Sequence, residues 1–144
     1  MSDPFYNKTV TVWNRHIDTV WEKETWFPTV IKDVRLVVSK GNNIMTSGLD
    51  TADTARLHIS DNISISDKPY MDPIEWSKLE TAEKAGYYTL DSQNYTFFVE
   101  GDTSEEATDR EDFFEYMKKT YNNCFKITSA DRFEIIPHYE CFGK

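Results

Sequence analysis

Apolar and polar residues alternate along much of this 144-residue chain, and a period of two is typical of a β-strand rather than a helix. The segment Lys8–Ile17 (KTVTVWNRHI) is rich in β-branched and aromatic residues and predicts the first strand. Residues 25–40 have a similar composition and predict two strands or one long bent strand, with Pro28 at a strand end, an edge or a bulge because proline cannot donate to a ladder. Residues 55–60 (ARLHIS) alternate strictly, which predicts a half-buried strand.

Residues 72–86 carry the start and stop signals of a helix of about three turns. Asp72 is suited to the N-cap, Pro73 to the first helical position and Gly86 to the end of the helix. The apolar residues recur at roughly helical spacing and predict one buried face, made by Ile74, Trp76, Leu79, Ala82 and Ala85.

A second helix is predicted over 108–123 (TDREDFFEYMKKTYNN), with Thr108 at the N-cap and Glu111 at the third position of a capping box. Acidic residues fill its expected first turn, and lysines fill its last turn before two asparagines. This order of charges is favourable for the helix dipole. Part of the local acidity therefore has a structural explanation.

Residues 40–48 (KGNNIMTSG) are predicted to form a loop, because glycine and asparagine favour turns. Two apolar residues, Ile44 and Met45, stand at its expected tip. Exposed apolar residues on a polar loop indicate contact with a partner.

The second half of the chain predicts further hairpins. Residues 86–101 predict one, with strands Tyr88–Leu90 and Tyr95–Glu100 and a turn at 91–94, and residues 124–142 predict one or two with a tight turn at Ala130–Asp131. Strands interrupted by two short helices, without regular βαβ alternation, predict a mainly β or α+β fold, a small antiparallel β-barrel or sandwich with two short helices. Because no repeat or Pro/Gly-rich linker divides the sequence, we expect a single β-rich domain over residues 1–144.

The chain is acidic, with a formal net charge of −9 and a pI near 4.8. This charge disfavours binding to nucleic acid or to an anionic membrane surface. The acidity is concentrated in residues 100–115, where eight acidic residues accompany one arginine. Five of them form a candidate acidic face: Glu105, Glu106, Asp109, Glu111 and Asp112. The many aromatic residues indicate core packing or protein contacts, since a stacking platform for single strands needs a basic groove.

No apolar run approaches the length of about 20 residues that spans a bilayer, and the first residues lack the pattern of a signal peptide. We therefore expect a protein made in the cytoplasm, without membrane contact. Cys124 and Cys141 have no C-x-x-C spacing, and a reducing compartment would keep both as thiols.

Asp50 and Asp53 are the first candidates for chemistry, because two nearby carboxylates can act as general acid and base. Aspartates also favour turns, where their side chains bond backbone N–H groups. The spacing of a calcium loop is absent from this segment. We therefore interpret both residues as the turn that precedes the strand over 55–60.

The three histidines, His16, His58 and His138, lie on three different predicted strands and lack the spacing of metal ligands. We interpret them as ordinary strand residues. His138 stands three residues before Cys141, and an odd separation on a strand places the two side chains on opposite faces, which argues against a catalytic pair. The sequence also lacks phosphate-loop, nucleophile-elbow and zinc-protease motifs. We expect no enzymatic activity, no cofactor and no metal.

Most of the chain is covered by five segments: TVTVWNRHIDTVWEKETWFPTVIKDV, GLDTADTARLHIS, KPYMDPIEW, GYYTLDSQNYTFFVEGD and FKITSADRFEIIPHYECFGK. In this order they resemble a family of small uncharacterised structural proteins from phages and prophages of Gram-positive bacteria. Each segment is a weak signal alone, and the shared order carries the resemblance. The chain departs from the family in SQN, where a Gly-Asp turn is usual, and in the acidity that follows Gly101.

The resemblance implies a non-enzymatic component of the head-to-tail connector of a long-tailed phage, such as a head-closure (stopper) or tail-completion protein. Such a protein forms a homo-oligomeric ring in the neck of the virion. It contacts portal, adaptor or tail proteins and lies near packaged DNA without specific binding. Ile44 and Met45 are then candidates for a contact between subunits or rings. The acidic face is a candidate for the lumen, because phosphate-binding contacts would hold sliding DNA, and a solvated helix start is the alternative.

Two other functions stay open. An acidic phage-encoded regulator or inhibitor would mimic DNA with the carboxylates of residues 100–115. A hydrolase would use Asp50, Asp53 and a histidine, although it lacks a supporting motif. A connector is expected in purified virions, whereas a DNA mimic is expected to stay free and to bind a host nuclease in a salt-sensitive way.

Overall fold

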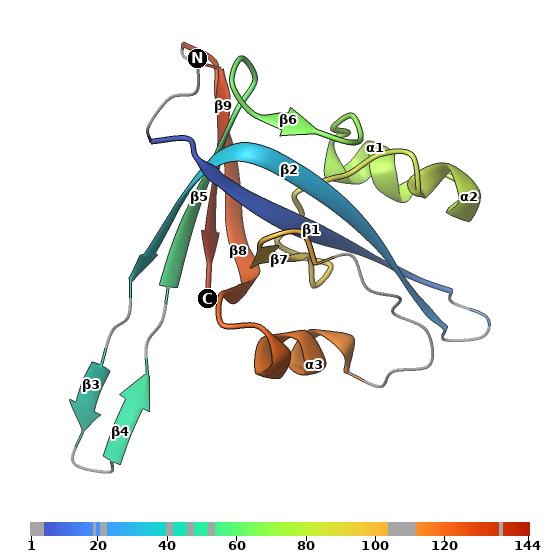
Figure 1. Cartoon of the computed structure of the whole chain (residues 1–144). Coiled ribbons are helices and arrows are strands. Elements are labelled where there is room, and N and C mark those ends of the chain that lie inside the picture. The colour runs from blue at the N-terminus through green and yellow to red at the C-terminus, as the bar shows by residue number, and fades with distance from the viewer. Residues whose placement is uncertain are drawn as a thin grey trace.

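The computed structural model describes residues 5–18, 20, 23–39, 42–45, 48–51, 54–103, 112–135 and 137–144. Within them, antiparallel strands dominate and are accompanied by short helices (Figure 1). The strands are β1 (Lys8–Ile17), β2 (Glu24–Ser39), β3 (Asn42–Met45), β4 (Gly48–Thr51), β5 (Thr54–Ser60), β6 (Ile65–Ser66), β7 (Phe97–Glu100), β8 (Cys124–Phe133) and β9 (His138–Gly143). The helices are α1 (Pro73–Ser77), α2 (Thr81–Lys84) and α3 (Phe113–Thr120). The predicted mainly β, α+β class is confirmed.

The body consists of two sheets that share strands. Together they make one continuous seven-stranded sheet in the order β1-β7-β8-β9-β5-β2-β6, and β2 also pairs with β1. Strand β2 pairs with β1 through residues 24–34 and with β5 through residues 35–39. Strand β8 likewise pairs with β7 through residues 124–126 and with β9 through residues 127–133. Because two strands bend from one sheet into the other, the body is not a regular barrel.

Local backbone features lie where these two strands change partners. Asp33 of β2 has a positive φ of 55°, a conformation that aspartate tolerates better than most residues. In β8 the register shifts between Ile127 and Ser129, as expected for a bulge, which bends a strand. Of the two predictions for residues 25–40, the single bent strand is correct. Pro28 pairs with β1 on one side, and its other side carries no strand among the described residues, which fits the predicted edge position.

Two hydrophobic clusters fill the body, and β1 contributes to both because both of its faces are buried. Val10 and Val12 belong to the first cluster, which lies between the sheets, and Trp13 belongs to the second. The inward residues of β5 join the first cluster, as the alternation predicts: Ala55, Leu57 and Ile59. In the second cluster Trp13 meets Phe113 of α3 edge to face, with ring centroids 4.7 Å apart. The aromatic residues of this cluster therefore serve as core.

The predicted helix over 72–86 forms as two short helices, α1 and α2, with Asp72 at the N-cap of α1 and Pro73 at its first position. The chain breaks between them at Glu80, whose extended backbone starts α2. Of the predicted apolar face, Trp76 is buried and Leu79 is half-buried, and the prediction is wrong for the three other residues, which are exposed: Ile74, Ala82 and Ala85. The side chain of Lys84 is buried instead. Its ammonium lies 4.9 Å from the Trp76 ring and 2.8 Å from Nδ1 of His16.

The predicted start of the second helix is also wrong. Helix α3 begins at Phe113, with Asp112 at the N-cap in a left-handed conformation, whereas Thr108 lies outside the described residues. Lys118 and Lys119 occupy the last turn as predicted. Glu115 lies in the first turn of α3, where an acidic side chain is favourable for the helix dipole.

Three further predictions are corrected by the observed strand pairing. The predicted loop over 40–48 contains β3, which pairs with β4 in a hairpin of its own. Tyr88 does not form a hairpin with β7, because its backbone bridges Tyr70 in parallel. Ala130–Asp131 is not a turn, since both residues are extended and pair with β9, and the connection from β8 to β9 follows Phe133. Across the part of the chain that the structure describes, no helix is long and apolar enough to cross a membrane.

Candidate functional site

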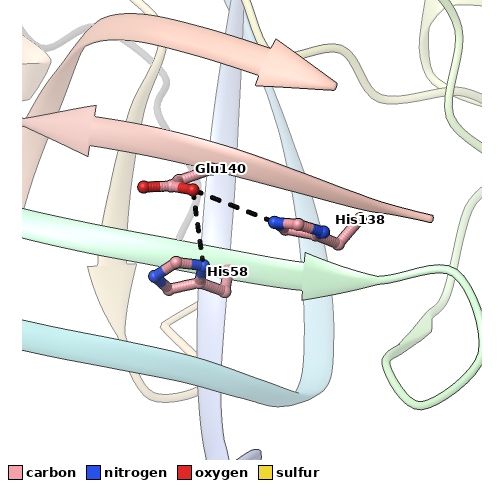
Figure 2. A group of neighbouring side chains, drawn as sticks. All are labelled: His58, His138 and Glu140. Carbon is pink, nitrogen blue, oxygen red and sulfur yellow. Dashed lines mark ion pairs between the residues drawn. The ribbon is translucent and has the colours of Figure 1, made fainter. Parts of the chain in front are cut away.

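Chemically active side chains gather on the outer face of the sheet formed by β5 and β9. The register places His58 opposite Glu140 and Ser60 opposite His138. Side chains alternate along these strands, so the inward neighbours, such as Leu57 and Cys141, are buried in the core. His58, His138 and Glu140 therefore lie on the same outward face, as Figure 2 shows.

Glu140 lies between the two imidazoles. Its Oε2 atom is 4.0 Å from Nδ1 of His58 and 3.8 Å from Nε2 of His138. The exposed fractions of the three side chains are 15% for His58 and 20% for each of the others. One potential ligand atom from each residue lies within 4.8 Å of the other two. The group is thus half-buried and reachable from solvent, and it could hold a metal ion.

The surroundings of this group are mixed in charge. Burial lowers the pKa of His58 below its ordinary value, the nearby Glu140 carboxylate opposes this, and the charges of Arg35 and Arg56 add to the lowering. His58 is therefore neutral near pH 7, which is the form of imidazole that binds metals. The ring of His138 stacks on Phe133, with centroids 4.9 Å apart and planes 11° apart.

A shallow depression of about 570 Å³ continues from His58 across the same face. Arg35 and Arg56 line it together with Phe142, and the guanidinium of Arg56 lies 5.3 Å from the centre of the Phe142 ring. The depression is basic and open on an otherwise acidic molecule.

His16 does not join the other two histidines. It lies on β1, where Nδ1 is 2.8 Å from the Lys84 ammonium and Nε2 is 3.3 Å from the Thr81 hydroxyl. Burial and the charge of Lys84 lower the pKa of His16, and Asp18 opposes them more weakly. The prediction that the histidines lie on three different strands is confirmed, but two of those strands are neighbours.

The cysteines are free and buried in different clusters, Cys124 in the second and Cys141 in the first. Burial raises the pKa of each thiol to about 12. Cys141 points into the core while His138 points outward, as the odd spacing predicts. A thiolate nucleophile at either position is therefore disfavoured.

The structure places the other predicted site residues only in part. Asp50 belongs to β4 and Asp53 lies outside the described residues, so the predicted turn at Asp50 is replaced by a strand. In β3 the backbone of Ile44 pairs with Leu49, and that of Met45 pairs with Gly48.

Of the candidate acidic face, only Asp112 is described; Glu105, Glu106, Asp109 and Glu111 lie outside the described residues. Asp112 borders a depression of about 310 Å³ that Arg15 and Lys126 also line. The surroundings of Asp112 are thus mixed in charge rather than purely acidic.

One part of the His58 group was visible in the sequence. His138 and Glu140 are two residues apart, so on a strand they share a face, and the pair could have been recognised as a candidate from its spacing. The position of His58 beside this pair could not be recognised from the sequence, because it depends on the pairing of β5 with β9.

Comparison with known proteins gives one assignment. A search of curated proteins and a search of solved structures find no match to this chain. The model of one protein family, described as a family of unknown function (DUF6751), matches residues 5–144. The match covers nearly the whole sequence, and the chain therefore belongs to this family of unknown function, DUF6751.

Proposed function

We propose that this protein is a structural, non-enzymatic component of the head-to-tail connector of a long-tailed phage, at head closure or tail completion. Copies of the chain form a ring in the neck of the virion and contact the neighbouring portal, adaptor or tail proteins. The phage setting rests on the ordered sequence resemblance described above. The structural observation that carries the proposal is the hairpin of β3 and β4.

This hairpin extends beyond the body of the protein. Strands β2 and β5 pair as far as Ser39 and Thr54, and β3 and β4 continue past this point (Figure 1). Among the described strands, β3 and β4 pair with each other and not with the seven-stranded sheet. An isolated two-stranded hairpin is marginally stable in water, so packing against a partner would stabilise it. Its free backbone edges also suit the addition of a neighbour's strand.

The charge of the molecule is compatible with a ring around DNA. A net charge of −9 makes extended binding to phosphates unfavourable, so DNA would slide past the protein rather than stick to it. The two packed clusters give the body a stable frame for the hairpin. The localisation that follows from the proposal is the virion neck, after synthesis in the host cytoplasm.

Mass spectrometry of purified virions tests the proposal directly. We expect the chain in virions, and we expect rings by electron microscopy when the purified protein is mixed with the products of neighbouring connector genes. Absence from virions would contradict the proposal. If the free protein instead bound a host nuclease in a salt-sensitive way, the acidic inhibitor would be the better assignment.

A paired set of variants tests the hairpin. We expect Ile44→Ser combined with Met45→Ser to abolish ring assembly or docking while leaving the melting temperature unchanged. The matched control is Ile74→Ser combined with Ile135→Ser, which removes two apolar side chains that are 69% and 99% exposed elsewhere on the surface. The control should assemble normally. Normal assembly of the hairpin variant would show that these two side chains are not the contact.

A further inference from the structure

We propose that His58, His138 and Glu140 form a binding site for one divalent transition-metal ion, with Zn²⁺ as the ion to test. Two imidazole nitrogens and one carboxylate oxygen are a donor set that zinc and its neighbours in the first transition row prefer over calcium and magnesium. The proposal concerns a surface separate from the hairpin, so it stands or fails independently of the connector function.

The spacing of the donor atoms is close to that of a metal site. In tetrahedral zinc coordination, with bonds of about 2.0–2.1 Å, neighbouring ligand atoms are about 3.3 Å apart. Here Oε2 of Glu140 is 3.8 Å from Nε2 of His138 and 4.0 Å from Nδ1 of His58. These two distances therefore need to shorten by about 0.5–0.7 Å, and the two imidazole donors, which lie within 4.8 Å of each other, need to approach by up to about 1.5 Å. In Figure 2 both rings face the same carboxylate oxygen, so no ring has to turn around.

The strands hold the donors in place before any ion binds. His58 and Glu140 are direct partners in the β5–β9 ladder, and His138 stands two residues before Glu140 on the same face. Partners in a ladder have a fixed separation, and stacking on Phe133 restricts the His138 ring. A site on two central strands therefore loses little conformational freedom on binding.

The charges near the site agree with a metal ligand set, with one opposing contribution. Arg35 and Arg56 line the depression beside His58. The same arginines repel a cation. The negative charges of Glu140 and of Asp131, its partner in the ladder between β8 and β9, offset this repulsion. Three protein ligands on a half-exposed face leave one coordination position for water.

Isothermal titration of the full-length protein with ZnCl₂ tests the proposal, and Co²⁺ absorption serves as a second measurement. We expect one saturable site per chain and a rise in melting temperature with excess Zn²⁺. His58→Ala and His138→Ala should each abolish this site, and Glu140→Gln should weaken it by more than the roughly tenfold lost when an outer-shell partner is removed, because it replaces a charged ligand.

The matched control is His16→Ala, which removes a histidine that lies apart from the site. It should bind Zn²⁺ as the wild type does. Circular dichroism confirms the fold of each variant, and Glu140→Gln keeps the size of the side chain if an alanine variant unfolds. The absence of saturable binding would overturn the proposal. So would equal loss of binding in His16→Ala, or unchanged binding in Glu140→Gln and the two alanine variants.

Discussion

Among the glycines whose surroundings the structure describes, Gly143 is the one where an added methyl group would meet the closest contacts. A Cβ at this position would lie 2.7 Å from Cβ of Phe125 and 3.0 Å from two ring atoms of Phe98. Ordinary carbon contacts are about 3.5–4.0 Å, so each of these contacts is about 0.5–1.3 Å too short. Neither neighbour can move aside easily, because both rings are buried and pack against each other with centroids 5.8 Å apart.

Gly143→Ala should therefore lower the free energy of unfolding by about 1–3 kcal/mol, the usual cost of overpacking a core. For a domain of this size, that corresponds to a fall in melting temperature of about 3–9 °C. Urea unfolding followed by circular dichroism measures the change. The matched control is Gly86→Ala, where the nearest atom to an added Cβ is Glu83 O at 3.5 Å. This control should be neutral or stabilising by up to about 1 kcal/mol. If both variants unfolded within about 0.5 kcal/mol of wild type, the reasoning about Gly143 would be refuted.

Three further predictions concern Asn14, the two cysteines and His16. Asn14→Ala should lower the free energy of unfolding by about 2–4 kcal/mol, because the buried Asn14 amide accepts from the N–H of Thr89 at 3.1 Å and donates to its C=O at 2.7 Å. Urea unfolding measures this loss, and a smaller value would show that water replaces the amide. The thiols of Cys124 and Cys141 should react with a thiol reagent only after unfolding, since burial raises both pKa values to about 12, and rapid labelling of the native protein would contradict this. His16 has a folded pKa below its ordinary value of 6.5, so its contribution to stability is present above about pH 6.5 and is lost as the pH falls below that value. His16→Gln should flatten the fall in unfolding free energy between pH 7 and 5, and parallel curves for variant and wild type would show that His16 does not contribute.

The sequence predicts the fold best where local pattern and burial agree. The bounds of β1 match the predicted strand Lys8–Ile17, and the alternation over 55–60 gives the correct inward residues of β5. The predictions fail where distant segments decide the outcome. Lys84 is buried because its ammonium contacts the Trp76 ring and the His16 imidazole. The spacing of apolar residues along a helix cannot predict these contacts. Ala130–Asp131 resembles a turn locally, but pairing with β9 keeps it extended.

In the candidate site, too, one part follows from local sequence and the other depends on distant pairing. The two-residue spacing of His138 and Glu140 is local, and strand geometry alone puts both on one face. His58 lies about 80 residues earlier and reaches them only through the antiparallel ladder between β5 and β9. A single sequence holds no signal for that register, since many partners have the same apolar alternation.

The continuity of β2 has a mechanical consequence. The strand that leads to the hairpin is the same strand that forms the ladder with β1, and β5, which returns from the hairpin, is bonded to both β2 and β9. A pull on the hairpin along the strand axes would load these ladders in shear, so that many interstrand hydrogen bonds resist together rather than breaking one at a time. A neighbour that grips β3 and β4 would thus be anchored to the centre of the sheet, where the load is shared by the core.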